Sequence, residues 1–249
     1  MRKLFLLAAL TLCAAPAASA QTTWHVGLRG GGNWATTTLD EASNAAPTSR
    51  ESHNAAKAGI VGGQAGVVLA ARFGKLALQP GLLLTQRGQQ MQTSSSLNAF
   101  GFRSQHETVS TTRSNWLELP LHIIYTLNAT RGPQVLAGPY LARAVGGRQK
   151  GTETHATSAL YPLPSTQEFD RPIDYRPDGF NERWDAGFDI GAGYQLGPWQ
   201  LQLVYSIGVV NLHRADTRSY YDYHHHTFEA DPAYNRVARL TAAYFWGSH

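Results

Sequence analysis

Hydrophobic and polar residues alternate most regularly between residues 184 and 210. Apolar side chains occupy every second position in two runs, 184–196 and 199–210, and polar residues or glycine fill most of the positions between them. A period of two is typical of β-strands, and the short Gly197-Pro198 link predicts an antiparallel hairpin. The apolar face of such a hairpin needs a partner, which is either a second sheet or lipid.

The same alternation recurs along the chain and predicts eight strands, at 24–34, 59–72, 76–88, 115–127, 134–145, 184–196, 199–210 and 237–246. The connections alternate in length. Short links lie at 73–75, 128–132 and 197–198, and long polar links lie at 35–58, 89–114, 146–183 and 213–236. Outer-membrane barrels have an even number of strands, tight periplasmic turns and long outer loops. The pattern therefore predicts an all-β fold, an eight-stranded antiparallel up-and-down transmembrane β-barrel with short periplasmic turns and long extracellular loops.

Aromatic residues near the strand ends favour lipid as the partner of the apolar faces. Trp24 and Trp34 share one face of a strand at a separation of ten residues, as do Trp184 and Tyr194. Ten residues of a tilted strand span about 25 Å, the height of the apolar band of a barrel. The predicted membrane-interface aromatics are Trp24, Trp34, Tyr125, Trp184, Tyr194, Trp199, Tyr244 and Trp246. A soluble exported β-barrel or sandwich is the alternative fold, because it too shows a period of two.

The N-terminus has the features of an export signal. Arg2 and Lys3 precede the apolar run 4–13, and Ala18-Ser19-Ala20 resembles a cleavage site. We expect residues 1–20 to be a signal peptide and residues 21–249 to form one outer-membrane β-barrel domain. Removing two basic residues from a chain with 21 Lys and Arg and 17 Asp and Glu leaves a net charge of +2. This balance gives no reason to expect nucleic acid as a partner.

Eight ionisable residues are predicted to face the barrel interior from their positions in the alternation. They are Arg29, Arg87, Glu118, His122, Arg143, Asp185, Asp189 and Arg239. The interior of an eight-stranded barrel is only wide enough for side chains to fill it, and unpaired buried charges are costly. We therefore predict a salt-bridged plug in which Arg87 pairs with Glu118, Arg143 with Asp185 and Arg29 with Asp189. A narrow pore or a proton-coupled site is the functional alternative.

The last long link contains the candidate metal ligands His224, His225 and His226. Imidazoles bind Zn, Cu and Ni well, but successive residues of an extended segment point apart. A polar loop that faces solvent or lipopolysaccharide is the alternative, and we expect no resident metal or cofactor.

No motif points to catalysis, and we expect no enzyme activity. A lipid-modifying enzyme of the outer membrane would need a Ser/His/acid arrangement at the rim or on the lipid face. No G-x-S-x-G motif occurs, and His122 is predicted to point inward. Such an enzyme remains the alternative function. The expected partners are outer-membrane lipid and lipopolysaccharide, with envelope proteins at the loops 146–183 and 213–236, because long loops on a rigid scaffold often carry recognition.

Four stretches resemble the PorT-like outer-membrane β-barrel family, namely 27–33, 76–84, 116–121 and 189–194. The segment Leu117-Glu118-Leu119-Pro120-Leu121 is the most specific of them. The resemblance covers essentially the whole mature chain and implies a porin-like, eight-stranded barrel in the outer membrane of a Gram-negative bacterium. Some members are linked to protein secretion. The chain departs from the family in its large third and fourth long links and in the tail Gly247-Ser248-His249. The patterns and the resemblance lead us to expect a structural or binding role at the cell envelope.

Overall fold

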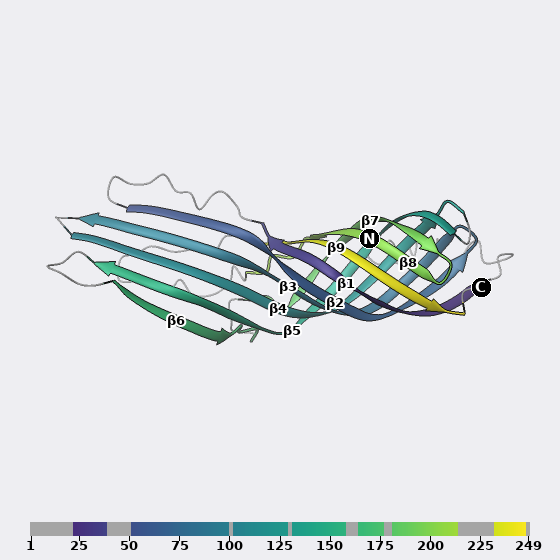
Figure 1. The fold of residues 1–249 in the computed structure, drawn as a ribbon, viewed down its shortest axis with the longest axis horizontal. Coiled ribbons are helices and arrows are strands. Elements are labelled where there is room, and N and C mark those ends of the chain that lie inside the picture. The colour runs from purple at the N-terminus through teal and green to yellow at the C-terminus, as the bar shows by residue number, and fades with distance from the viewer. Residues whose placement is uncertain are drawn as a thin grey trace, which may run out of the picture.

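The computed structural model describes residues 22–38, 51–99, 102–128, 131–157, 164–176, 181–213 and 232–247. The predicted signal peptide lies outside these residues. The strands are β1 (Thr23–Thr37), β2 (Glu51–Phe73), β3 (Leu76–Ala99), β4 (Phe102–Thr126), β5 (Arg131–Thr157), β6 (Ser165–Pro172), β7 (Trp184–Leu196), β8 (Trp199–Gly208) and β9 (Asn235–Trp246) (Figure 1). The described part of the chain contains no helix long and apolar enough to span a membrane.

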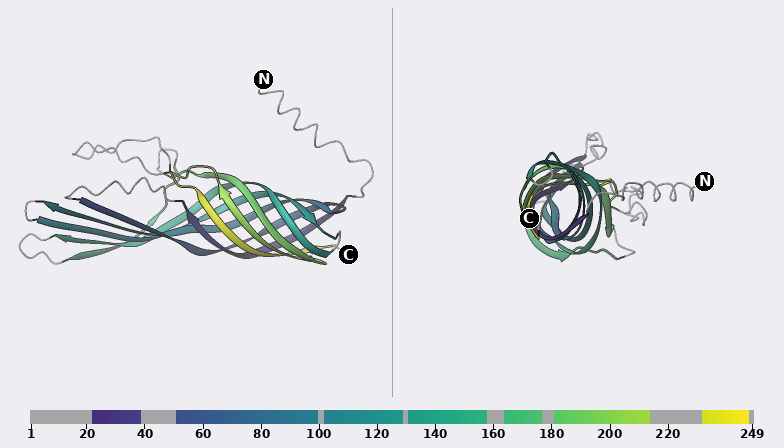
Figure 2. Two further views of the ribbon diagram at one scale, coloured as in Figure 1. Left: turned by 90° about the horizontal axis from the view of Figure 1, so that it is seen from above. Right: turned by 90° about the vertical axis from the view of Figure 1, so that its right-hand side faces the viewer.

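Eight of these strands close into a ring. Neighbours pair antiparallel in the order β1, β2, β3, β4, β5, β7, β8 and β9, and β9 pairs back with β1 (Figure 2). The closing ladder runs from Val26 opposite Trp246 to Thr37 opposite Asn235. This ring confirms the predicted eight-stranded antiparallel barrel. Strand β6 lies outside the ring and pairs with β5 alone.

The barrel is polar inside and apolar outside. On β8 the alternation is strict: Gln200, Gln202 and Ser206 are buried, while outward residues such as Leu203 are exposed. The side chains of Leu203 and Ile190 are 61% and 59% exposed. A continuous apolar belt of this kind would be unfavourable in water, and it matches the lipid-facing band of an outer-membrane barrel.

Tight turns join the strands at one end of the barrel. Gly74 and Gly197 occupy the two-residue links after β2 and β7 with φ of 62° and 59°. Glycine adopts these left-handed angles at little cost, so the strands can reverse immediately. In outer-membrane barrels the end with short turns faces the periplasm.

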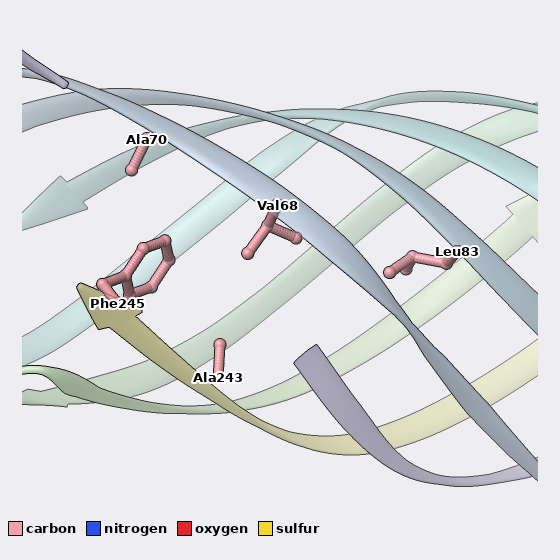
Figure 3. Close-up of a cluster of buried hydrophobic side chains, with 5 residues drawn as sticks. All are labelled: Val68, Ala70, Leu83, Ala243 and Phe245. Carbon is pink, nitrogen blue, oxygen red and sulfur yellow. The ribbon is translucent and has the colours of Figure 1, made fainter. Parts of the chain in front are cut away.

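A small apolar cluster fills the barrel near these turns. Val68, Ala70, Leu83, Ala243 and Phe245 pack together there and are 1–2% exposed (Figure 3). Gly27 makes room for the largest of them. A Cβ at Gly27 would come within 2.8 Å of the Phe245 ring and 2.7 Å of a backbone oxygen.

The prediction that the long links are loops was wrong for much of their length. Strands β2 to β5 continue past the ring, and β6 adds a fifth strand to this extension (Figures 1 and 2). We call residues 51–59, 89–99, 102–114, 146–157 and 165–172 the protruding sheet. Strands β3 and β4 keep one register from Leu76 opposite Tyr125 to Ala99 opposite Phe102.

The composition of the protruding sheet explains why its strands were missed. In the β3 extension, QQMQTSSSLNA, one face is entirely polar and the other is half polar, so no continuous apolar face forms. A strand without an apolar face lacks the alternation of apolar and polar residues by which strands are recognised in a sequence. Its backbone can still pair with neighbouring strands, and threonine favours extended structure. A bulge also shifts the register of β5: Trp116 pairs with Ala144, but Asn115 pairs with Gly146. Val145 is therefore an extra residue where β5 leaves the barrel.

Candidate functional site: the barrel interior and its outer mouth

Seven of the eight residues predicted to point inward lie in the barrel interior. Arg29, Arg87, Glu118, His122, Asp185, Asp189 and Arg239 are at most 4% exposed. They come from five strands, and each follows the inward parity of its strand. The interior therefore holds three arginines and three carboxylates, with one histidine beside them.

The prediction that Arg143 points inward was wrong. Its side chain lies on the outer face, with the guanidinium carbon 5.6 Å from the ring centre of Trp184. The prediction assumed that the polar side of each strand faces the interior. On this part of β5 the inward side chains are instead the buried Tyr140 and Ala142. Arg143 is close to the outer edge of the apolar belt, where a long cationic side chain can reach the headgroup region.

Glu118 and Asp185 are the acceptors at the centre of a hydrogen-bond network in the half of the interior farther from the tight turns, which we call the upper interior. Glu118 accepts hydrogen bonds from both Arg87 and Arg239, and Nη2 of Arg239 lies 3.1 Å from its Oε2. Arg87 also donates from Nη1 to Oδ2 of Asp185 at 2.7 Å. Asp185 accepts further hydrogen bonds from Tyr140 at 3.0 Å and Asn235 at 2.8 Å.

One of the three predicted ion pairs is present. Arg87 pairs with Glu118, as expected from adjacent strands. Arg143 does not reach Asp185, which binds Arg87 instead. Asp189 accepts from Nε2 of His122 at 2.8 Å and lies 3.7 Å from Arg239. The prediction considered only neighbouring strands, whereas arginine is long enough to cross a narrow barrel.

Arg29 contacts glutamines rather than a carboxylate. It donates to Gln79 and to Gln200, and Gln79 donates to Gln200 at 3.1 Å. The hydrogen bonds continue from Gln200 to Gln134 at 3.0 Å and from Gln134 to Gln195 at 3.2 Å. We call these four residues the glutamine cluster; all are at most 4% exposed. Their inward alternation was visible in the sequence, but our prediction named only charged residues.

A small cavity lies at the outer mouth of the barrel. It measures about 80 Å³, and Arg87, Trp116, Tyr175 and Asn235 are among its lining residues. The hydroxyl of Tyr175 donates to Oγ of Ser114 at 2.9 Å, and the rings of Tyr175 and Trp116 meet edge to face with centroids 6.3 Å apart. Burial raises the pKa of Tyr175, so it stays a neutral donor. The space is sufficient for a few water molecules.

The candidate metal ligands and His122 differ in whether they lie within the described residues. No group of three or more His, Cys, Asp and Glu side chains is placed to hold an ion in the described ranges. His224, His225 and His226 lie outside them. Nδ1 of His122, the atom opposite the one that binds Asp189, has no hydrogen-bond partner.

The predicted interface aromatics lie on the outer surface. Seven are 41–67% exposed: Trp24, Trp34, Tyr125, Trp184, Tyr194, Trp199 and Trp246. Tyr244 is half-buried between Trp199 and Trp246, with ring centroids 5.0 and 5.5 Å away. Amphipathic rings at such positions suit the boundary between lipid tails and headgroups.

The polar interior, apolar belt and closed ring define a transmembrane β-barrel. A model of the family described as "Outer membrane protein beta-barrel domain" matches residues 19–214, and the chain belongs to this family. Fold and family together place the protein in the outer membrane.

Two solved structures are similar to this chain at low scores. The translocator domain of autotransporter NalP from Neisseria meningitidis is 10% identical, with a TM-score of 0.20, and the match covers 98% of this chain and 94% of that one. The TodX deltaS2S3 mutant monoaromatic hydrocarbon channel is 7% identical, with a TM-score of 0.23 and coverages of 92% and 91%. Scores this low carry no functional weight. No curated protein matches the chain.

Proposed function

We propose that the protein is a non-catalytic outer-membrane barrel that presents the protruding sheet at the cell surface as a binding platform. The observation that carries this proposal is the continuation of four barrel strands beyond the ring, with β6 added at the side. A sheet that is already paired loses little conformational entropy when it binds a partner.

The edge of the protruding sheet gives a route for recognition. In the described part of the chain β6 is the last strand on its side, with β5 as its one neighbour. Edge strands offer backbone donors and acceptors to an extended segment of another protein. Near the barrel, Asp170 on β6 pairs with Arg148 at 2.9 Å and Lys150 at 3.0 Å on β5. Both arginine and lysine pull the pKa of Asp170 below its usual range, so β6 is held by charge as well as by backbone.

A narrow pore is the less favoured alternative. The upper interior is crossed by Arg87 and Arg239, which meet at Glu118, and the lower interior is filled by the glutamine cluster and Phe245. The interior of an eight-stranded barrel is only wide enough to hold the inward-facing side chains of its own strands. The cavity at the mouth ends on this network.

The position of His122 supports a non-catalytic role. Its ring is 1% exposed inside the barrel, and its free Nδ1 has no serine hydroxyl against it. A lipid substrate would have to enter a filled interior to reach this ring. An enzyme would therefore require a different site.

We also propose that the protein is PorT-like within its family. The segment Leu117-Glu118-Leu119-Pro120-Leu121 supports this, since its leucines form part of the lipid belt while its glutamate binds two arginines inside. A role in secretion would follow from that relationship. Loss of secreted proteins from a deletion strain, restored by the wild-type gene, would support it; an unchanged set would refute it.

Site-specific photo-crosslinking in cells tests the binding role. A photoreactive residue is placed at Ser94 or Glu168 on the protruding sheet, and at Leu203 in the lipid belt as the control. We expect discrete adducts with an envelope protein or lipopolysaccharide from the first two positions and lipid adducts alone from Leu203. Identical products at all three positions would contradict a binding platform.

A further inference from the structure

Two histidines face each other on the protruding sheet. His106 on β4 lies directly opposite His155 on β5. Their Nδ1 atoms are 2.9 Å apart and their ring centroids 4.2 Å apart. Directly opposed residues of antiparallel strands project from the same face, so the strand register itself brings these rings together. The barrel interior and the proposed binding edge make no use of this pair.

We propose that His106 and His155 form a binding site for a divalent transition metal, with Cu(II) preferred over Ni(II) and Zn(II). Imidazole nitrogen is a good ligand for all three ions, and the intrinsic order of affinity places Cu(II) first. Two nitrogens at about 2.05 Å from one ion and at right angles to each other are about 2.9 Å apart. The 2.9 Å between the two Nδ1 atoms is a hydrogen-bond distance in the metal-free pair, and it also equals the separation of two adjacent ligands in a square-planar site, the geometry that Cu(II) and Ni(II) favour.

Thr108 holds one ring in the form that can bind metal. Its Oγ1 lies 3.0 Å from Nε2 of His106. When Nε2–H donates to this hydroxyl, Nδ1 carries the lone pair that a metal needs. Metal-binding histidines are commonly oriented by such a hydrogen bond from the second ring nitrogen.

Metal binding requires one proton to move. When Nε2–H of His106 donates to Thr108, the proton between the two Nδ1 atoms belongs to His155, which then donates to His106. With metal, that proton shifts to Nε2 of the exposed His155 ring, and both Nδ1 lone pairs point at the ion.

The neighbouring residues leave coordination positions at the proposed ion unfilled. Glu153 lies two residues from His155 on the same face of β5 and adds negative charge near a bound cation. No third His, Cys, Asp or Glu in the described ranges is close enough to complete a set of ligands. Water, or a donor from another molecule, would fill the remaining positions. We therefore expect a labile, exchangeable ion rather than a structural one.

The test is a titration of the full-length protein in detergent with Cu(II). Calorimetry measures the affinity, and the nitrogen couplings in the electron paramagnetic resonance spectrum report the ligands. The wild type should bind one Cu(II) with two nitrogen ligands at this pair. His106→Gln and His155→Gln should each weaken that binding by about tenfold or more, and Thr108→Val by a smaller factor. Heat-modifiable gel migration confirms that each variant is folded.

The triple substitution of His224, His225 and His226 by glutamine separates this site from the other histidine cluster. Binding that persists in the triple variant and is lost in His106→Gln supports the proposal. Unchanged binding in both single variants, loss in the triple variant, or no saturable binding by the wild type would overturn it. This result is independent of the proposed binding platform.

Discussion

At the scale of single residues, Glu118 is the carboxylate that binds two arginines in the barrel interior. It is fully buried between Arg87 and Arg239, which come from strands on different sides of the barrel. Its inward position was predictable from the Leu-Glu-Leu pattern, and so was its pairing with Arg87. The contact with Arg239 was not, because β4 and β9 are not neighbours in the ring.

Glu118→Gln should destabilise the barrel by about 3–5 kcal/mol, because it leaves two buried guanidinium groups without a full charge partner. Urea unfolding in detergent micelles measures the change. Glu107→Gln is the matched control, since Glu107 is exposed on the protruding sheet and accepts from Gln92 at 2.8 Å. The control should change stability by no more than about 0.5 kcal/mol. Equal midpoints for both variants would show that the interior charges contribute nothing.

Asp174 should titrate far below an ordinary aspartate. Hydrogen bonds from the side chain and backbone of Arg176 lower its pKa to about 2. Because the folded pKa is depressed, this contact is complete above about pH 4 and is lost as the pH falls through about 2. Nuclear magnetic resonance of the carboxyl carbon gives the midpoint, and Arg176→Gln should return it to the ordinary range. A wild-type midpoint near 4 would show that the contact is absent.

At the scale of elements, burial decides which strands can be recognised in a sequence. Each barrel strand separates lipid from a polar interior, so its alternation is strong and the eight strands were predictable. The protruding strands have water on both sides and carry no such signal. The inward prediction for Arg143 was wrong for a related reason. Near Tyr140 the inner face of β5 is apolar, so polarity does not distinguish its inner face from its outer face.

Leu203→Arg should cost about 2–4 kcal/mol, because it places a cation near the middle of the lipid belt. Leu203 is 61% exposed and lies on the central part of β8. Ser94→Arg is the control on the protruding sheet, where the new side chain faces water beside Glu107. Refolding into lipid vesicles, followed by urea titration, measures both. A cost at Ser94 equal to that at Leu203 would argue against lipid around β8.

At the scale of the whole molecule, a closed interior is combined with an extended outer sheet. The interior is nearly balanced in charge and filled from the mouth to the periplasmic turns. The outer sheet is built from continuations of the barrel strands β2 to β5, with β6 added at its side. This arrangement supports recognition outside the barrel rather than transport through it.

The purified protein should show no steady conductance in a planar bilayer. Ions would have to displace paired arginines and carboxylates from a space that has no spare width. The double variant Arg87→Ala and Glu118→Ala shortens two of the largest fully buried side chains and is the comparison of choice. Brief current steps in that variant alone would fit a plug. Steady nanosiemens currents through the wild type would establish the pore instead.

The sequence by itself determined the all-β barrel, its strand number, its lipid-facing side and most of its interior charges. Each of these depends on a period of two maintained between lipid and a polar interior. The tertiary structure alone decided which charges meet across the barrel, because arginine side chains join strands that are distant in the ring. It also decided that the polar links become strands. Their pairing comes from the backbones of neighbouring strands that extend together, and backbone hydrogen bonds leave no hydrophobic pattern in the sequence.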